Sequence, residues 1–295
     1  MINQVTKDKI ESLRQHYLSL SIGKADILRE IATTEIPEMV YNSNAIENST
    51  LTLEDTEDIL IRNQISKDHD IREIYEAKNL AQITEKLLDH PSEKLSISLI
   101  LDLHRILLTG IRDDWAGRFR SGREWVRIGT HMGANPEFTS GLMHDLVSKY
   151  SEETDEYFLD KIAHFHAEFE LIHPFNDGNG RMGRVLINQQ LGVLGLPTIT
   201  IQNKSKFNDY YPLFNEYSKT NKYDGFTELF ALLLLESLNK RIARLSARRI
   251  ISLSRWAKNN NVRANLVLNQ AKRQTIPAFR MNEKWMIDED FILSI

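Results

Sequence analysis

One short segment, residues 173–184 with the sequence HPFNDGNGRMGR, contains the residue types that phosphate chemistry requires. Gly178 and Gly180 flank Asn179 where a helix is expected to begin, so backbone N–H groups can converge there without obstruction by β-carbons. The positive end of the helix dipole reinforces these donors. The segment therefore predicts a cradle for a di- or triphosphate.

The charged side chains of the same segment add the remaining parts of a reaction site. Arg181 and Arg184 lie three residues apart on the expected helix, so both guanidinium groups can face one anion. Asp177 offers a hard oxygen ligand for a Mg²⁺ that bridges phosphates. His173 is the only group of the segment that accepts a proton near neutral pH. Together these residues predict phosphate-transfer chemistry at a hydroxyl.

Any one of these residues also has an ordinary structural interpretation, as a turn glycine, a hydrogen-bonded histidine or a surface arginine. The ordered set, however, matches the signature HPFx(D/E)GNGRxxR of the Fic family at every position, and the chain resembles Fic proteins over about residues 37–235. The resemblance implies a helical fold and the transfer of AMP from ATP to a Ser, Thr or Tyr hydroxyl of a target protein. Pyrophosphate would be released.

The resemblance also implies a role for each position of the motif. His173 is expected to be the general base that deprotonates the target hydroxyl, and Asp177 is expected to bind Mg²⁺. The residues implied in ATP binding are Gly178, Asn179, Gly180, Arg181, Met182, Gly183, Arg184, Tyr210 and Tyr211. Among them, residues 179–181 would hold the α- and β-phosphates and Arg184 the γ-phosphate. The two tyrosines would lie near the adenine, with core packing as the open alternative for each.

An insert between residues 114 and 136 interrupts the helical pattern. It alternates short β-type runs with glycines, which predicts a hairpin or loop that faces a substrate. The part around residues 125–130 resembles the Fic flap, which aligns a target segment by strand-like backbone pairing. The resemblance implies this docking role for Val126, Arg127, Ile128 and Gly129.

A second motif lies upstream of the insert. Residues 43–48 (SNAIEN) match the (S/T)xxxE(G/N) motif of Fic proteins whose inhibitory helix precedes the catalytic core, with Ser43 and Glu47 at the fixed positions. A bidentate ion pair between Glu47 and Arg184 would occupy the guanidinium that the γ-phosphate needs. The resemblance thus implies autoinhibition. An exposed glutamate at a helix end is the structural alternative.

Two further functions are compatible with these residues. A protein of the same fold could remove AMP from a modified target, with Glu47 orienting a water molecule. Alternatively, the chain could be a DNA-binding regulator whose Fic-like domain senses nucleotide, although a sensor has no need of a base such as His173. A zinc site at His164 and His166 is disfavoured, because their spacing is not the i, i+4 spacing of helical zinc ligands.

The elements that position these motifs are expected to be helices, since Gly (13) and Pro (7) are sparse among 295 residues. Apolar periodicity predicts helices over residues 6–32, 39–47, 70–88, 96–108, 140–149, 155–173, 180–192, 207–217 and 226–249, with another start at Thr52. Pro37 is expected to interrupt the first of these patterns. The expected architecture is mainly α: a Fic-type helical bundle with a small hairpin, plus a small C-terminal module. The expected domains are an N-terminal helical region (1–95), a Fic catalytic domain (96–245) and the C-terminal module (250–295).

The C-terminal part of the chain is basic, whereas the rest is acidic. Residues 240–295 contain 12 Lys and Arg against 4 Asp and Glu, whereas residues 1–239 contain 25 against 37. This asymmetry predicts either an anionic partner or a solvated basic helix.

Residues 252–287 resemble the winged helix-turn-helix of excisionase-like DNA-binding proteins, with two helices around a turn at residues 259–261 and then two strands. DNA contacts would come from Arg263, Asn265, Asn269, Lys272, Arg280 and Lys284. A module that docks protein targets or forms a homodimer is the competing interpretation.

Composition restricts the remaining possibilities. The chain contains no cysteine, which excludes disulfides, thiolate nucleophiles and cysteine-bound zinc. The longest apolar run, residues 229–235, is too short to cross a bilayer, and the first residues contain no apolar stretch of the signal-peptide kind. We therefore expect a cytoplasmic protein without a membrane partner.

Overall fold

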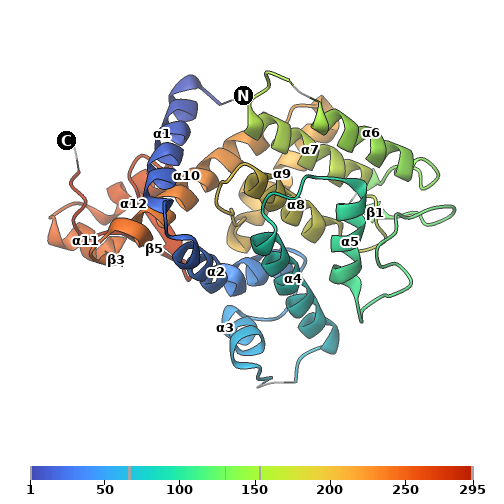
Figure 1. Ribbon diagram of the computed structural model, residues 1–295, viewed down its shortest axis with the longest axis horizontal. Helices are drawn as coiled ribbons and strands as arrows, with labels where there is room; N and C mark the ends of the chain where they lie inside the picture. The colour runs from blue at the N-terminus through green and yellow to red at the C-terminus, as the bar shows by residue number, and fades with distance from the viewer. Residues whose placement is uncertain (1, 66–67, 130, 153, 294–295) are drawn as a thin grey trace. The chain divides into compact units, whose positions relative to one another are not determined.

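Helices form most of the chain, which confirms the predicted fold class (Figure 1). The computed structural model describes residues 2–65, 68–129, 131–152 and 154–293. The helices are α1 (Gln4–Ser21), α2 (Ala25–Ile46), α3 (Leu53–Glu57), α4 (Ile71–Asp89), α5 (Ile97–Leu108), α6 (Thr139–Ser151), α7 (Phe158–Ile172), α8 (Asn179–Val193), α9 (Tyr211–Thr220), α10 (Asp224–Ser246), α11 (Leu253–Asn259) and α12 (Ala264–Lys272). Three shorter turns are η1 (Asp58–Arg62), η2 (Asn203–Ser205) and η3 (Lys206–Tyr210).

The chain forms two compact units. The larger unit comprises residues 33–195 and 200–227, and the smaller unit comprises residues 1–32, 196–199 and 228–295. The domain ranges predicted from the sequence stay a prediction.

Side-chain caps explain where several helices of the larger unit begin. The hydroxyl of Ser96 accepts a hydrogen bond from the N–H of Leu99 and caps α5, and Asp70 caps α4 in the same way. Thr52 and Asp55 form a reciprocal capping box at the start of α3. These starts agree with the sequence pattern, because capping depends on residues close together in the chain.

The expected interruption at Pro37 is wrong, because α2 continues through this residue to Ile46. A proline inside a helix costs about 3 kcal/mol through its missing N–H and its steric clash. Ile36, Val40 and Ile46 of the same helix are all buried, and each buried aliphatic side chain contributes roughly 1.5–3 kcal/mol. Packing therefore outweighs the local cost of the proline.

The core of the larger unit lies between α4, α5, α7 and α8 (Figure 1). Leu99, Leu103 and Leu107 recur along one face of α5 and are almost completely buried. Phe165 and Phe169 of α7 belong to the same cluster. The packed core therefore fixes the end of α7 and the start of α8, and the motif of residues 173–184 runs from the one into the other.

The insert between residues 114 and 136 contains the predicted hairpin. Strands β1 (Arg127–Ile128) and β2 (His131–Met132) pair antiparallel, with Arg127 opposite Met132. The β-structure is shorter than the run of residues 124–128 suggests. Thr130, which was included in the predicted flap, lies outside the described residues.

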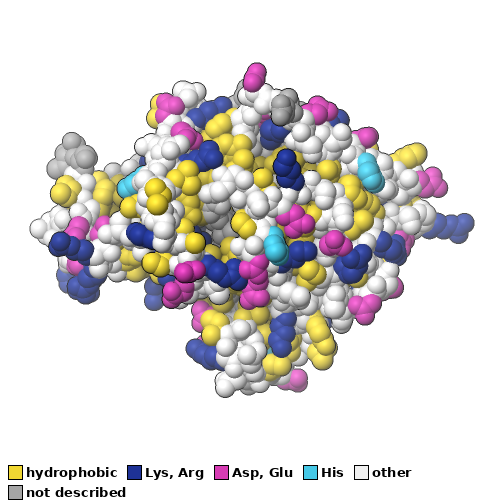
Figure 2. All heavy atoms as spheres, in the orientation of Figure 1, with side chains coloured by type: hydrophobic (Ala, Val, Ile, Leu, Met, Phe, Trp, Pro, Cys, Tyr) yellow, Lys and Arg dark blue, Asp and Glu magenta, His cyan; other side chains and the backbone are white. Residues whose placement is uncertain are grey.

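The smaller unit contains a three-stranded antiparallel sheet in the order β3-β5-β4, built from β3 (Ile250–Ser252), β4 (Phe279–Met281) and β5 (Lys284–Asp288). Trp256 of α11 and Val267 of α12 pack into a hydrophobic cluster with Ile287 of β5. The predicted order of two helices followed by two strands is present, whereas β3 was not expected. Basic side chains lie over the region of α11 in Figure 2. DNA binding, protein docking and dimer formation stay predictions.

None of the helices within the described residues is long and apolar enough to cross a membrane.

The packing of α5 leads to a stability prediction. Leu103 is fully buried, so we expect Leu103→Ala to lower the free energy of unfolding by about 2–5 kcal/mol. Leu142 on α6 is 38% exposed, and Leu142→Ala should change this free energy by less than about 1 kcal/mol. Chemical denaturation measures both values. Equal losses for the two variants would contradict this description of the core.

Candidate active site

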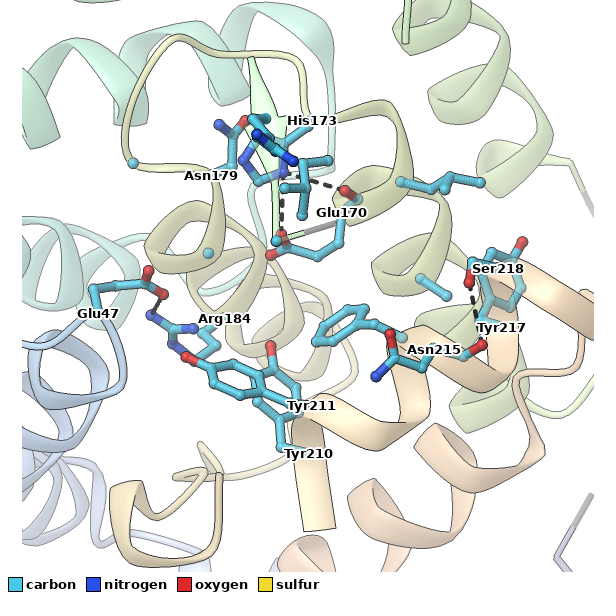
Figure 3. Close-up of a pocket in the computed structure, with 18 of the residues that line it drawn as sticks. Glu47, Glu170, His173, Asn179, Arg184, Tyr210, Tyr211, Asn215, Tyr217 and Ser218 are labelled. Carbon is cyan, nitrogen blue, oxygen red and sulfur yellow. Dashed lines mark hydrogen bonds and ion pairs between the residues drawn. The ribbon is translucent and has the colours of Figure 1, made fainter. Parts of the chain in front are cut away.

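A cavity of about 600 Å³ lies in the larger unit, beside the junction of α7 and α8 (Figure 3). The predicted site residues that line it are Glu47, Arg127, Ile128, Gly129, His173, Asp177, Gly178, Asn179, Gly180, Arg184, Tyr210 and Tyr211. Arg181 instead lines a neighbouring polar pocket. The side chain of Met182 is buried in the hydrophobic core and does not line the cavity. The tertiary structure thus brings most of the predicted residues to one cavity.

His173 ends α7 in the left-handed region, with φ 52° and ψ 64°, which few residues other than glycine adopt. Its imidazole Nδ1 lies 3.2 Å from the carbonyl oxygen of Glu170 and 3.8 Å from the carboxylate of the same residue. Figure 3 shows His173 and Glu170 directed toward one another. The contact with the carbonyl oxygen orients the imidazole, with Nδ1 as its N–H donor.

Arg120 holds this unusual backbone in place. Its guanidinium donates hydrogen bonds to the carbonyls of His173 at 2.7 Å and Ile172 at 2.9 Å. It also donates to the carbonyl of Ala134, at the base of the β1–β2 hairpin. Arg120 is only 1% exposed, so one buried cation joins the end of α7 to the hairpin.

The turn before α8 has the form of an anion cradle. Gly178 has φ 81°, and a β-carbon at this position would lie 2.8 Å from Leu107. The side-chain amide of Asn179 pairs with the N–H and the carbonyl of Phe175, both at 2.8 Å. Since the first N–H groups of any α-helix lack helical partners, the start of α8 offers its donors to an anion.

His104 supports the cradle from α5. Its ring stacks on Phe175 with 3.6 Å between centroids. Nδ1 accepts a hydrogen bond from the N–H of Gly117 at 3.1 Å, so Nε2 donates to the carbonyl of Asp177, also at 3.1 Å. Burial lowers the pKa of His104 to about 4, which keeps the ring neutral at physiological pH.

The carboxylate of Asp177 belongs to a ring of four charged groups. It pairs with Arg72 from α4 and, at 3.2 Å, with Arg181. Glu76 in turn pairs with Arg72 at 2.9 Å and with Arg181 at 3.0 Å. Burial by itself raises the pKa of Asp177, but the charges of Arg181 and Arg72 lower it overall. Asp177 is therefore an ionised oxygen donor in this structure.

The predicted ion pair between Glu47 and Arg184 is present, with 2.8 Å between Oε1 and the guanidinium (Figure 3). The expectation of a bidentate pair is wrong. Nε of Arg184 instead donates to the hydroxyl of Ser43 at 3.0 Å, and Nη2, which binds Glu47, also donates to the carbonyl of Ser43 at 2.9 Å. Ser43 lies one helical turn before Glu47, so both residues reach the same guanidinium from α2.

Burial and the partner's charge have opposite effects on the pKa of each residue of this pair. Burial by itself raises the pKa of Glu47, but Arg184 lowers it overall through its charge and hydrogen bond. Burial by itself lowers the pKa of Arg184, but the charge of Glu47 raises it overall. Because the side chain of Arg184 is only 8% exposed, these acceptors must compensate the cost of burying its charge.

The two predicted adenine contacts differ in their surroundings. Tyr210 is 1% exposed, its hydroxyl lies 2.9 Å from Nε2 of His166, and its ring packs edge-on against Phe226. It is thus both a core residue and part of the cavity wall. Tyr211 donates its hydroxyl to the carbonyl of Ile46 at 2.8 Å, at the end of α2.

Glu170 is a cavity residue that the sequence interpretation did not include. Burial raises the pKa of its carboxyl group to about 8. A β-carbon at Gly183 would collide with this group, which explains why a glycine occupies that position on α8. Glu170 lies one helical turn before His173, and this i, i+3 spacing could have indicated it.

The other residues missed by the sequence interpretation come from distant parts of the chain: Arg72, Glu76, His104, Arg120 and Lys206. No local spacing connects them with the motif, so only the tertiary structure reveals their contacts.

The hairpin reaches the cavity through Arg127, Ile128 and Gly129. Gly129 has φ 55° at the tip, where a side chain would be strained. Val126 accepts a hydrogen bond from the N–H of Gly133 at 3.1 Å, which closes the base of the hairpin. The docking role of these residues stays a prediction.

The raised pKa of Glu170 leads to a pH prediction. The folded state binds its proton more tightly than the unfolded state, so the stabilising contribution is complete below about pH 4.5 and is lost as pH rises toward about 8. Glutamine does not titrate. We expect the difference in melting temperature between the parent protein and Glu170→Gln to shift against the parent protein as the pH rises from 5 to 8. A difference that does not change with pH would contradict a buried, protonated Glu170.

Comparison with known proteins agrees with this geometry. Residues 94–191 match the Fic/DOC family. A protein named protein adenylyltransferase Fic, from Nematostella vectensis, is 30% identical over 222 residues, which cover 73% of this chain and 51% of that protein. The chain therefore spans about half the length of this curated relative.

Solved structures show the same fold. A Fic domain containing signaling protein from Bacteroides thetaiotaomicron superposes with a TM-score of 0.72 at 27% identity, over 80% of this chain and 96% of that one. A Fic family protein from Desulfovibrio desulfuricans G20 has a TM-score of 0.63 at 22% identity, over 100% of this chain and 98% of that one, and shows likeness of fold alone. The motif, the cradle and the family match lie in the same part of the chain, since residues 94–191 match the Fic/DOC family.

Proposed function

We propose that this protein is a protein adenylyltransferase that transfers AMP from ATP to a Ser, Thr or Tyr hydroxyl of a target protein, and that Glu47 restrains it. The observation that carries the proposal is the position of Glu47. Its carboxylate contacts Arg184 and lies where a β-carbon of Gly180 would be, against the first turn of α8. A carboxylate thus occupies an anion site built for phosphate.

The orientation of His173 suits the role of general base. Because Nδ1 donates to the carbonyl of Glu170, Nε2 carries the lone pair that takes the proton of the target hydroxyl. The hydroxyl oxygen then forms a bond to the α-phosphorus of ATP. The bond between that phosphorus and the bridging oxygen breaks, and pyrophosphate leaves with the electron pair.

The described residues also fit a Mg²⁺ that arrives with the nucleotide. They contain no cluster of three or more His, Asp or Glu side chains arranged around one ion. Mg²⁺ in nucleotide sites is commonly held by one or two carboxylates together with phosphate oxygens, so the single ionised carboxylate of Asp177 is sufficient. Such an ion would neutralise charge on the phosphates. Arg72 and Arg181 pair with Asp177 in the resting structure and would have to share it.

The same arrangement explains the proposed restraint. The γ-phosphate and Glu47 are both anions, and both require the guanidinium of Arg184. While Glu47 is bound, ATP lacks this contact and cannot place its α-phosphate next to His173. Relatives named protein adenylyltransferase support adenylyl transfer as the reaction.

Labelling with ATP carrying a reporter on its α-phosphate tests the proposal. Incubated with Mg²⁺, the parent protein should label itself or proteins of a lysate weakly. Glu47→Gly should raise the labelling about tenfold or more, because Arg184 becomes available to the γ-phosphate. A tenfold rise corresponds to about 1.4 kcal/mol. Adding His173→Ala to that variant should lower the labelling by roughly 10²–10⁴-fold through loss of the base.

A reporter on the γ-phosphate serves as the control and should leave no label, because pyrophosphate is the leaving group. If Glu47→Gly is folded by circular dichroism but labels nothing, the proposed function is wrong. Equal labelling by the parent protein and Glu47→Gly would refute the restraint alone.

A further inference from the structure

We propose that Lys206 is a positioning residue for Glu47: its ammonium group holds the C-terminal end of α2 in the place from which Glu47 reaches Arg184. This inference rests on the proposed function, because it assumes that Glu47 is inhibitory. It adds a residue outside both sequence motifs and a way in which the restraint can be released.

All hydrogen-bond donors of the Lys206 ammonium group have acceptors. Nζ donates hydrogen bonds to the carbonyls of Ala45 at 2.9 Å and Ile46 at 3.1 Å, and to the side-chain oxygen of Asn48 at 3.2 Å. An ammonium group has three donors, so all three are used on the residues that flank Glu47. Lys206 is only 6% exposed.

The acceptors of Lys206 lie at the C-terminal end of α2, where a cation stabilises the helix. The last carbonyls of a helix lack helical partners and carry partial negative charge, so a cation stabilises them. α2 ends at Ile46, and Asn48 turns the chain away with φ 69°. Glu47 lies between Ile46 and Asn48, so the direction of its side chain depends on where this helix end is held.

A second group fixes the same helix end. The hydroxyl of Tyr211 donates to the carbonyl of Ile46, which therefore receives hydrogen bonds from both Lys206 and Tyr211. Lys206 is the first residue of the π-helical turn η3, and Tyr210 is its last. Tyr210 and Tyr211 also line the cavity. One short segment thus connects the cavity wall with the inhibitory helix, and π-helical turns occur frequently at functional sites.

Removing the ammonium group should free Glu47 without altering Glu47 itself. In Lys206→Met the aliphatic stem is retained while the three donors are lost. We expect labelling with the α-phosphate reporter to rise by roughly threefold to thirtyfold, because hydrogen bonds from charged groups are among the strongest in proteins. In a Glu47→Gly background the same substitution should change labelling by less than about twofold, since no inhibitory side chain remains to be released.

Two control variants separate this effect from a general disturbance. Lys204→Met replaces an exposed lysine in the same segment and should leave labelling at the parent level. Lys206→Arg keeps the positive charge and the hydrogen-bond donors, so this variant should retain most of the restraint on labelling. If Lys206→Met fails to give a cooperative melting transition, Asn48→Gly carries the test, because it removes one acceptor and tolerates the positive φ.

Hydrogen–deuterium exchange gives a readout that does not depend on activity. Ser49 donates its N–H to the carbonyl of Asn44, and Asn48 donates to that of Ala45, so both amides report on the end of α2. Lys206→Met should speed exchange in residues 47–49 and leave α5 unchanged.

The possible outcomes distinguish the two proposals. If Glu47→Gly gives no labelling, the proposed function fails whatever Lys206 does. The inference about Lys206 is overturned if Glu47→Gly is active while Lys206→Met labels and exchanges like the parent protein. It is also overturned if Lys206→Met activates the Glu47→Gly variant as strongly as it activates the parent protein.

Discussion

The buried guanidinium of Arg184 is the constraint on which the rest of the site depends. An arginine stays charged in proteins, so one that is almost inaccessible to water must be given acceptors by the fold. Here they are the hydroxyl and carbonyl of Ser43 and the carboxylate of Glu47, all supplied by the end of α2. Any anion that enters the cradle competes for the same donors. On the proposed function, the position of this one helix end would determine whether the site is open to phosphate.

The second requirement is a rigid turn between α7 and α8. The backbone has positive φ at His173 and at Gly178, and only the glycine adopts this conformation without strain. Long-range contacts compensate: Arg120 binds the carbonyls at the end of α7, and His104 binds the carbonyl of Asp177. Donors that are fixed before the substrate arrives need no reorganisation during the reaction, which is the usual source of electrostatic catalysis. On the proposed function, these contacts would hold the donors of the cradle ready for the phosphates.

The outcome for individual elements shows which features local sequence can predict. Helix starts at Asp70 and Ser96 agree with the sequence pattern because a capping side chain and the N–H that donates to it are only two or three residues apart. The expected break at Pro37 was wrong because the cost of a proline is local, whereas the burial that offsets it involves side chains from elsewhere in the fold. Strand β3 was missed because its partner β5 lies far away in the sequence, whereas β4, which is equally short, is joined to β5 by a tight turn.

The sequence by itself determined which chemical groups are present, in what order, and which glutamate could reach Arg184. The motif of residues 173–184 places the groups proposed as base, oxygen ligand and cradle within one turn and one helix start, where spacing alone defines the geometry. Only the tertiary structure decided how these groups are shared: Ser43 takes donors that were assigned to Glu47, Arg72 pairs with Asp177, and Lys206 binds the end of α2. Such contacts join residues more than a hundred positions apart. They depend on how helices pack, and no local periodicity records that packing.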